Sequence, residues 1–449
     1  MGVKRFGREY VVLGIALLMA GSMWLYVQRV MLPFEQERFA KVGRPQDPGD
    51  LYPRWYGTRE FLLHGRDPYS AEVSGEIQRE YYGHPLDVAG ADRGRDEQRF
   101  AYPLYVVFLL APTMEMPFPV VRIAARWTLA LATAASVLLW LWALRWRPSA
   151  AVMVTIIVLI LSSPPLVQAL KLQQLALLVV FFLVLCAVLV SRGQLVWAGC
   201  FLALATIKPQ LALLPVVWFL IWIAGDWKNR RRMAWGFGGT MVVLVGGSLA
   251  LLPGWMESFA RGLTAYSHYA GMSSLLDHYF TPRLAKPAAA LAWGALPVFC
   301  WRWRREAAGA PSFLVRFALM LSVAVIALPP LWPPFNQALL LPGVLSVICY
   351  WNRLWSRRGL VRSLCRFGAG LVLWSWLAAS IFVVARWMAP STRLFDVWAF
   401  PPVTFPGIWP FQFVMSYGLP PFVMVLLMVL LMDLDAETRP AKIRLGVSC

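Results

Sequence analysis

Apolar stretches long enough to cross a lipid bilayer recur along almost the whole of this 449-residue chain. A helix needs about 20 mainly apolar residues to span the hydrocarbon core, where every backbone polar group has to be satisfied internally. Apolar residues make up 59% of the chain and charged residues only 14%, which is not the composition of a soluble globular protein. We therefore predict an all-α polytopic membrane protein without a sizeable soluble domain.

The orientation of the spans follows from short basic loops, because Lys and Arg near helix ends stay on the cytoplasmic side. Threading helices between these loops predicts about 12 transmembrane helices with both termini in the cytoplasm. The first span is too long for the apolar run of a signal peptide, so we interpret it as an uncleaved anchor. The predicted spans lie near residues 10–31, 122–144, 150–167, 172–191, 194–207, 209–224, 234–252, 287–302, 313–331, 337–352, 366–388 and 412–432.

We predict one integral membrane domain, residues 1–432, followed by a cytoplasmic tail, residues 433–449. The first external loop, residues 32–101 and called loop one below, carries 13 of the 23 acidic residues of the chain. The apolar segment 102–117 follows it. Counting that segment as a span would put the next basic loop on the external side, so we predict a juxtamembrane helix at the outer leaflet. A plain thirteenth span is the alternative.

The charge distribution argues against two kinds of partner. The formal net charge is +19, but the basic residues lie at helix ends, where they serve topology and contact anionic lipid head groups. Binding to nucleic acid is therefore not expected. All four histidines fall in segments predicted to be external, and their spacing is not that of metal ligands, so we expect no metal site.

Polar residues that could form a site are concentrated in three external regions: loop one, the loop 253–286 and the Pro-rich turn 329–337. Four further polar residues lie near the outer ends of predicted helices: Lys171, Gln173, Gln174 and Lys208. Ionisable groups at such depth are costly and usually face a cavity or a partner, which makes them functional candidates. For Lys208 the alternative is a side chain that extends to the interface.

A set of short motifs occurs in order along the chain: Asp50-Leu51-Tyr52, then Gly65-Arg66-Asp67-Pro68-Tyr69, then Tyr102-Pro103-Leu104, then Gln174, then Ala198-Gly199 and Ile207-Lys208-Pro209. Over roughly residues 1–350 this set resembles glycosyltransferase family 87 in order and spacing. Members of that family are membrane enzymes of the GT-C type. They take a sugar, typically mannose, from a polyprenyl-phosphate donor on the outer side of the membrane.

The resemblance implies a GT-C-like fold and a hexosyltransferase of the bacterial inner (plasma) membrane and cell envelope, with its active site on the external, periplasmic face. By this resemblance Asp50 matches the catalytic aspartate of the first loop. Gln174 and Lys208 match polar residues that face the donor site, and segment 102–117 matches a juxtamembrane helix before the second span.

Two departures from the family pattern concern the donor and the acceptor. Where the family often has Gly-Gln-x-Asn, this chain has Gln173-Gln174-Leu175-Ala176. Where a histidine often follows the late Trp, this chain has Trp332-Pro333-Pro334-Phe335-Asn336. These departures affect the identity of the sugar and of the acceptor more than the type of reaction.

The reaction implied by the resemblance explains the residue types. A sugar on a lipid phosphate already has a good leaving group, so the enzyme has to deprotonate an acceptor hydroxyl and stabilise the phosphate charge. We expect Asp50 to act as the general base, with inversion at C1. The candidates for substrate binding are Arg54, Arg122, Arg126, Gln174, Lys208, Asn336 and His268.

The expected partners are a polyprenyl-phosphate sugar as donor, membrane lipid, and an acceptor glycan or glycolipid. No cofactor is expected, because fixed cations can replace a divalent metal. Each site residue also has a simpler interpretation. Asp50 and Arg54, one helical turn apart, could form a surface ion pair of little energetic weight, and Arg122 and Arg126 could anchor a span against lipid phosphates.

A competing function is a multi-pass transporter or flippase for a lipid-linked or anionic substrate, with Lys171 and Lys208 as substrate or coupling charges. Transporter folds often contain internal repeats and interrupted helices near the midplane. No internal repeat is visible in this sequence, and the long acidic loop one favours a catalytic platform.

Overall fold

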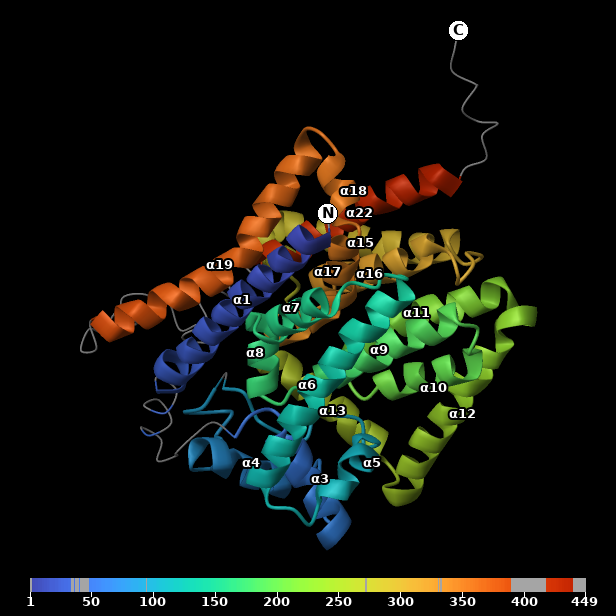
Figure 1. Ribbon diagram of the computed structural model, residues 1–449. Helices are drawn as coiled ribbons and strands as arrows, with labels where there is room; N and C mark the ends of the chain where they lie inside the picture. The colour runs from blue at the N-terminus through green and yellow to red at the C-terminus, as the bar shows by residue number, and fades with distance from the viewer. Residues whose placement is uncertain are drawn as a thin grey trace.

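The computed structural model describes residues 2–33, 36, 40, 48–93, 95–270, 273–329, 331, 333–388 and 417–438, and over these ranges the chain forms helices without any strand (Figure 1). This confirms the predicted all-α class. The helices are α1 (Gly2–Tyr26), continued by a π-helix (Val27–Met31), α3 (Tyr52–His64), α4 (Ala71–Tyr82), α5 (Val106–Leu110), α6 (Phe118–Ala143), α7 (Ala150–Leu161), α8 (Pro164–Lys171), α9 (Ala176–Ser191), α10 (Leu195–Ala205), α11 (Pro209–Gly225), α12 (Trp227–Leu251), α13 (Trp255–Ala270), α14 (Leu276–Tyr279), α15 (Pro282–Arg302), α16 (Pro311–Ala327), α17 (Leu341–Cys349), α18 (Trp351–Ser356), α19 (Leu360–Met388) and α22 (Leu419–Thr438).

Six helices of the described part are long and apolar enough to cross a membrane: α1 with its continuation, α6, α12, α15, α19 and α22. The pair α7–α8 counts as a seventh if a bent pair is one span. The helices α9, α10, α11 and α16, and α17 with the turn before it, are apolar but shorter. Each predicted span overlaps one of these helices, so the protein is polytopic, while the count of 12 crossings stays a prediction.

The predicted span 150–167 differs most from the structure. The chain breaks after α7, and α8 then runs at 62° to it. Pro164 and Pro165 open α8, where proline is tolerated because the first N–H groups of a helix have no partner within it. The bend brings the end of α8 close to the beginning of α3. A backbone hydrogen bond from Asp50 to Leu172, described below, joins the two segments.

The centre of the bundle is formed by α9, which packs against α6, α10 and α11 (Figure 1). Ten of its sixteen residues are buried, as expected for a helix that is apolar on all sides. Large aromatic side chains extend this core. Trp218 stacks on Phe313, and Phe219 and Phe317 pack beside them. Contacts between aromatic rings therefore hold α11 against α16.

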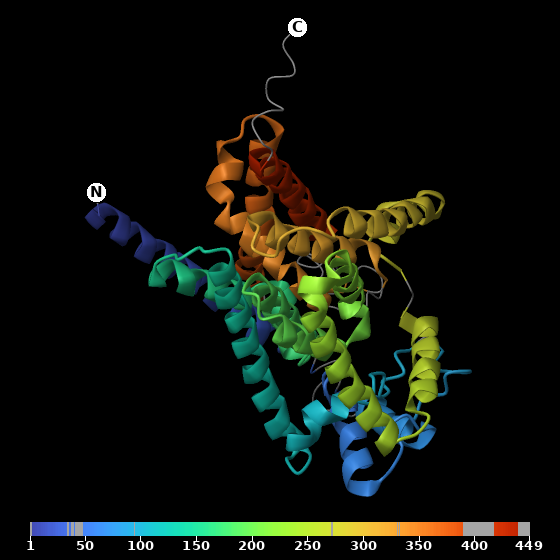
Figure 2. The ribbon, with the colours of Figure 1, turned by 90° about the vertical axis from the view of Figure 1, so that its right-hand side faces the viewer.

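Loop one folds into a small platform of α3 and α4. The segment 65–69 ends α3 and turns the chain, with Gly65 in the left-handed conformation (φ +66°). Arg66 joins the two helices, donating to Glu60 at 2.8 Å and to Glu76 at 2.9 Å. Figures 1 and 2 show this platform at one end of the molecule and the end of α22 at the other, with α6 and α12 extending toward the platform.

The segment 102–117 contains only α5, five residues long, and a three-residue 3-10 helix, Ala111–Thr113. Both pack against α3. Neither is long enough to span a bilayer, and the location of this segment at the outer leaflet stays a prediction. The predicted tail 433–449 begins within α22, and its residues 439–449 lie outside the described part of the chain.

Candidate active site

Asp50 lies in the turn that leads into α3, and its backbone is held from two directions. Its amide N–H donates to the carbonyl oxygen of Leu172 at 2.9 Å, which ties loop one to the turn between α8 and α9. From the other side, the Tyr81 hydroxyl of α4 donates to the carbonyl oxygen of Gly49 at 2.6 Å. The position of the carboxylate is therefore determined by both the platform and the bundle.

The carboxylate of Asp50 accepts a hydrogen bond from the side-chain amide of Gln174, at the start of the α9 segment. The oxygen of the same amide accepts from the Lys208 ammonium at 3.0 Å. Gln174 therefore bridges the carboxylate and the cation with both ends of its amide group.

The ammonium of Lys208 has a second partner, the side-chain oxygen of Asn336, also at 3.0 Å. Asn336 lies on the 3-10 helix Pro334–Leu340, which precedes α17 and packs against α8. Gln174, Lys208 and Asn336 are each 4–5% exposed. Three segments far apart in the sequence thus place buried polar groups beside Asp50. We call Asp50, Gln174, Lys208 and Asn336 the Asp50 cluster.

The electrostatic character of this cluster is unusual for a protein interior, because the ammonium of Lys208 is bonded to neutral amide oxygens. An ammonium has three N–H donors, and among the described residues two of them are used by Gln174 and Asn336. The ring of Phe335 lies beneath the charge at 5.2 Å. The Asp50 carboxylate lies beyond the Gln174 amide and not in direct contact with the ammonium. Since a buried cation is costly unless it is compensated, an anionic ligand at Lys208 would be favourable.

Arg54 lies next to the cluster in the first turn of α3. Its Nη1 donates to the backbone carbonyl of Asp50 at 2.8 Å, and its guanidinium lies 4.6 Å from the centre of the Tyr102 ring. Burial acts to lower the pKa of Arg54, but the neighbouring Tyr102 and Asp50 outweigh it, so the pKa is raised and the group stays charged. The Nε atom is buried and has no partner among the described residues. Arg54 therefore bonds to the backbone of Asp50, and its side chain does not form the surface ion pair with the Asp50 carboxylate that was considered from the sequence.

The remaining predicted binding residues are not joined to this cluster. Arg122 is half-buried and Arg126 is exposed, both in the first turns of α6. In the described part of the chain, neither forms a hydrogen bond or ion pair with a member of the Asp50 cluster. The side chain of His268 lies outside the described part of the chain. Among the described residues no group of three His, Cys, Asp or Glu side chains could hold a metal ion.

Sequence reasoning missed the residues that hold Asp50 in place. Gly49 and Gln173 both have left-handed backbones, with φ of +79° and +50°, and the carbonyl of Leu172 is a main-chain group without any sequence signature. The glycine directly before Asp50 was the one available signal, because glycine adopts positive φ without steric cost.

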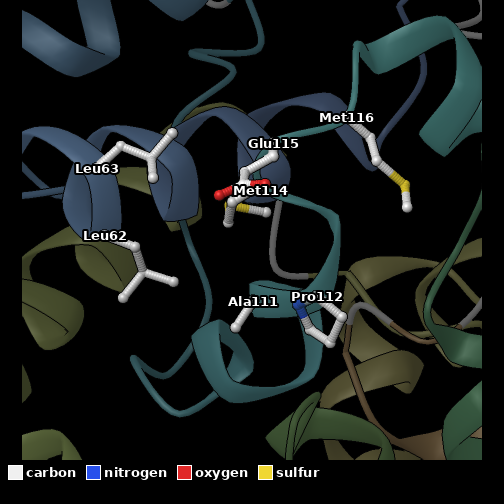
Figure 3. A pocket seen from close by; sticks show the side chains of 7 residues that line it. All are labelled: Leu62, Leu63, Ala111, Pro112, Met114, Glu115 and Met116. Atoms are coloured by element: carbon white, nitrogen blue, oxygen red, sulfur yellow. The ribbon is translucent and has the colours of Figure 1, made fainter.

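A cavity of about 480 Å³ opens elsewhere on the platform, between the end of α3 and the turn after α5 (Figure 3). Apart from Glu115, its lining residues are apolar, and none belongs to the Asp50 cluster: Leu62, Leu63, Ala111, Pro112, Met114, Glu115 and Met116. A lining without cations suits an apolar group better than a phosphate or a sugar. The polar chemistry of the protein is therefore expected at Asp50 and not in this cavity.

Comparison with known proteins agrees with the resemblance seen in the sequence. The family model of glycosyltransferase family 87 matches residues 100–329, which is half of the chain. The matched range includes Gln174 and Lys208, begins after Asp50 and ends before Asn336. No curated protein matches the chain.

The assignment distinguishes between the two functions considered from the sequence, because a glycosyltransferase is an enzyme and a transporter is not. The helices that could cross a membrane agree with the membrane location of the family. From its family match and its apolar helices, the chain belongs to glycosyltransferase family 87 and is an integral membrane glycosyltransferase.

Proposed function

We propose that the protein transfers a hexose, mannose by the family resemblance, from a polyprenyl-phosphate donor to a hydroxyl group of an acceptor glycan or glycolipid. The transfer inverts the configuration at C1, and Asp50 is the general base. The reaction takes place on the external face of the bacterial inner membrane, where the donor is held within the lipid.

The observation that carries this proposal is the bridge that Gln174 forms between the Asp50 carboxylate and the Lys208 ammonium. The reaction needs a base for the acceptor hydroxyl and a cation for the departing phosphate. The two groups have to be far enough apart for C1 of the sugar to lie between them. An amide between them satisfies both groups and keeps them from neutralising each other in a direct ion pair. Neutral partners leave the cation available to an incoming anion.

The proposed step conserves atoms and charge. The acceptor oxygen forms a bond to C1 of the sugar as the bond from C1 to the phosphate oxygen breaks. The electron pair of that bond leaves with the polyprenyl phosphate, and the hydroxyl proton of the acceptor passes to the Asp50 carboxylate. Attack opposite the departing phosphate produces the inverted configuration.

Fixed cations stabilise the charge that develops on the leaving phosphate. Arg54 contacts the backbone of Asp50 and Lys208 is linked to its carboxylate through Gln174, and both carry N–H groups that no described residue uses. A guanidinium suits paired phosphate oxygens, whereas an ammonium acts as a point charge. We propose that these cations replace a divalent metal ion. Arg122 and Arg126 are assigned to the lipid phosphates at the membrane surface.

The external location of the site rests on the topology predicted from charge. Loop one contains Asp50 and most of the acidic residues, and its platform lies at the end of the molecule opposite the end of α22 (Figure 2). The basic loops and the end of α22 would then face the cytoplasm.

The proposal is tested by transfer of radiolabelled sugar in membrane vesicles that contain the native protein or the Asp50→Asn variant. The donors are a panel of polyprenyl-phosphate sugars and, for comparison, nucleotide sugars. Transfer from a polyprenyl-phosphate donor by the native protein alone, with an inverted anomeric configuration in the product, supports the proposal. Transfer from nucleotide sugars only, or a retained configuration, overturns it.

A further inference from the structure

Gly49, directly before Asp50, lies against the side chain of Gln173. A β-carbon added at Gly49 would meet Oε1 of Gln173 at 2.8 Å and the carbonyl oxygen of Leu172 at 3.4 Å. The first distance is shorter than real side chains tolerate, and the second is an ordinary contact. Only a hydrogen atom fits between the backbone of residue 49 and Gln173.

The side chain of Gln173 has little freedom to move away from this contact. It is completely buried, and its amide nitrogen donates to the carbonyl oxygen of Leu170 at 3.2 Å and to that of Lys171. Its Oε1 is buried and accepts no hydrogen bond among the described residues. Both donors of the amide are directed at the end of α8, so the oxygen is directed at Gly49.

The backbone of Gln173 is also constrained. Its φ of +50° lies in the left-handed region, which costs a residue other than glycine of the order of 1 kcal/mol. Strained backbone of this kind persists where the surrounding structure enforces it, and it is concentrated at functional sites. Here the strained residue directly precedes Gln174, the partner of the Asp50 carboxylate.

We propose that Gly49 and Gln173 are positioning residues, whose close contact sets the separation between the Asp50 carboxylate and the Gln174 amide. The inference rests on the proposed role of Asp50 as the base. Gly49 directly precedes Asp50 and Gln173 directly precedes Gln174, the two partners of the side-chain hydrogen bond. The backbone hydrogen bond from Asp50 N–H to Leu172 O joins the same two segments. A shift of either segment therefore moves the carboxylate relative to the acceptor hydroxyl.

The kinetic test uses Gly49→Ala, with Gly65→Ala as the matched control. Gly65 also belongs to loop one and has a similar φ of +66°, but a β-carbon there would meet no atom within 4 Å. Both variants carry the cost of a left-handed alanine, and only Gly49→Ala adds the collision with Gln173. We expect kcat of Gly49→Ala to fall by about a hundredfold, the effect of misplacing a reacting group by about 1 Å. The KM for the donor stays unchanged, as does kcat of Gly65→Ala.

A second-site variant tests the contact itself. In the double variant Gly49→Ala with Gln173→Gly, the colliding oxygen is gone and residue 173 adopts positive φ without strain. We expect kcat of the double variant to recover in part, above Gly49→Ala and below Gly65→Ala, because the collision is relieved but the buried side chain of Gln173 is lost. Equal kcat in Gly49→Ala and Gly65→Ala, or no recovery in the double variant, overturns the proposal.

A measurement independent of activity separates this proposal from the proposed function. In a variant whose native cysteines are replaced by serine, Asp50→Cys and Gln174→Cys are cross-linked with a short bifunctional thiol reagent. We expect Gly49→Ala to slow cross-linking severalfold, Gln173→Gly to restore it in the double variant, and Gly65→Ala to leave it unchanged. If no donor supports transfer but cross-linking follows this pattern, the proposed function fails and the contact stands. Cross-linking that is insensitive to Gly49→Ala overturns the contact, whatever the activity.

Discussion

The ammonium of Lys208 donates to the side-chain oxygen of Asn336 at 3.0 Å, across 128 positions of sequence. This bond joins the turn between α10 and α11 to the 3-10 helix before α17. Both side chains are buried, and neither belongs to the platform that carries Asp50. The Lys208 cation is therefore held by the bundle alone, whereas the Asp50 carboxylate belongs to loop one and is held by the platform and the bundle together.

The first prediction separates catalysis from stability at Lys208. Lys208→Met keeps most of the length of the side chain and removes its charge, so we expect kcat to fall by about a hundredfold, the size of effect found on removing an electrostatic group from a transition state. The thermal midpoint should fall as well, because the buried oxygens of Gln174 and Asn336 lose their donor, so kcat is compared at equal amounts of folded protein. The exposed Lys228→Met is the control. Native activity in Lys208→Met would remove this residue from the mechanism.

The second prediction concerns the pH dependence of the platform. Hydrogen bonds from Arg66, opposed in part by burial and aided by Tyr56, hold the pKa of Glu76 below its ordinary value of 4.5. A carboxylate with a lowered folded-state pKa stabilises the fold above its unfolded pKa, and this stabilisation is lost as the pH falls through the folded-state value. Native protein should therefore exceed Glu76→Gln in thermal midpoint at pH 7, with the difference shrinking below about pH 4.5.

The control for this experiment is Glu72→Gln. Glu72 lies 3.6 Å from the same Arg66, but its side chain is 79% exposed, and exposed ion pairs contribute little. The thermal midpoint of Glu72→Gln should equal that of the native protein at every pH. A difference between native protein and Glu76→Gln that is constant from pH 7 to pH 4 would contradict the assignment.

The third prediction tests the packing of α10 against α12. A β-carbon at Gly236 would lie 2.0 Å from the carbonyl oxygen of Val196, and one at Gly199 would lie 2.2 Å from that of Met233. The obstructing atoms are main-chain atoms, so the helices have to separate to admit a methyl group. We expect Gly236→Ala to lower the thermal midpoint clearly.

Gly239 lies one turn further along α12, and a β-carbon there meets nothing within 4 Å. Gly239→Ala should be neutral or slightly stabilising, because alanine is favoured over glycine within helices by about 0.5–1 kcal/mol. If both alanine variants had the same thermal midpoint, the close approach of α10 and α12 would be incorrect.

The fourth prediction concerns the attachment of α22. Arg316 in α16 is 2% exposed at its side chain and pairs with both Glu306 and Asp435. Replacing it with methionine removes the cation that Glu306 and Asp435 share, which costs about 3 kcal/mol for a buried pair. Arg353→Met breaks pairs with Asp433 and Glu437, but its side chain is 29% exposed and Asp433 keeps Arg357.

We therefore expect Arg316→Met to lower the thermal midpoint and the yield of folded protein, and Arg353→Met to change both much less. Proteolysis of the C-terminal helix in detergent would report the same order. Equal susceptibility of the two variants would show that Arg316 does not hold α22.

Part of this structure followed from the sequence because it depends on local composition. The long apolar runs predicted α6 and α19 closely. Such helices are defined by one continuous apolar run whose helical length is close to the bilayer thickness. The bend between α7 and α8 was not predicted. Within an apolar run, the sequence does not distinguish a proline that begins a second helix from a proline inside one continuous helix.

The site was predicted unevenly for a similar reason. Gln174 and Lys208 were identified because polar groups stand out in apolar runs. Asp50 was identified through the family resemblance and Asn336 through its place in the Pro-rich external turn. The contact between Gly49 and Gln173 could not be predicted, because it depends on two backbone conformations and on the direction of one amide group. The apparent departure from the family at Gln173 now has a physical consequence, namely a glutamine in a conformation that favours glycine.

The most direct test of the account is the single-turnover rate of sugar transfer by Asp50→Asn, measured at saturating donor against native protein and Asp67→Asn. Asp67 belongs to the same loop, and its carboxylate accepts from the backbone N–H of Tyr69, a bond that asparagine preserves. We predict a rate for Asp50→Asn that is lower by about 10²–10⁴-fold, as for loss of a general base, and a native rate for Asp67→Asn. Native rates in both variants, at equal amounts of folded protein, would contradict the assignment of Asp50 as the base.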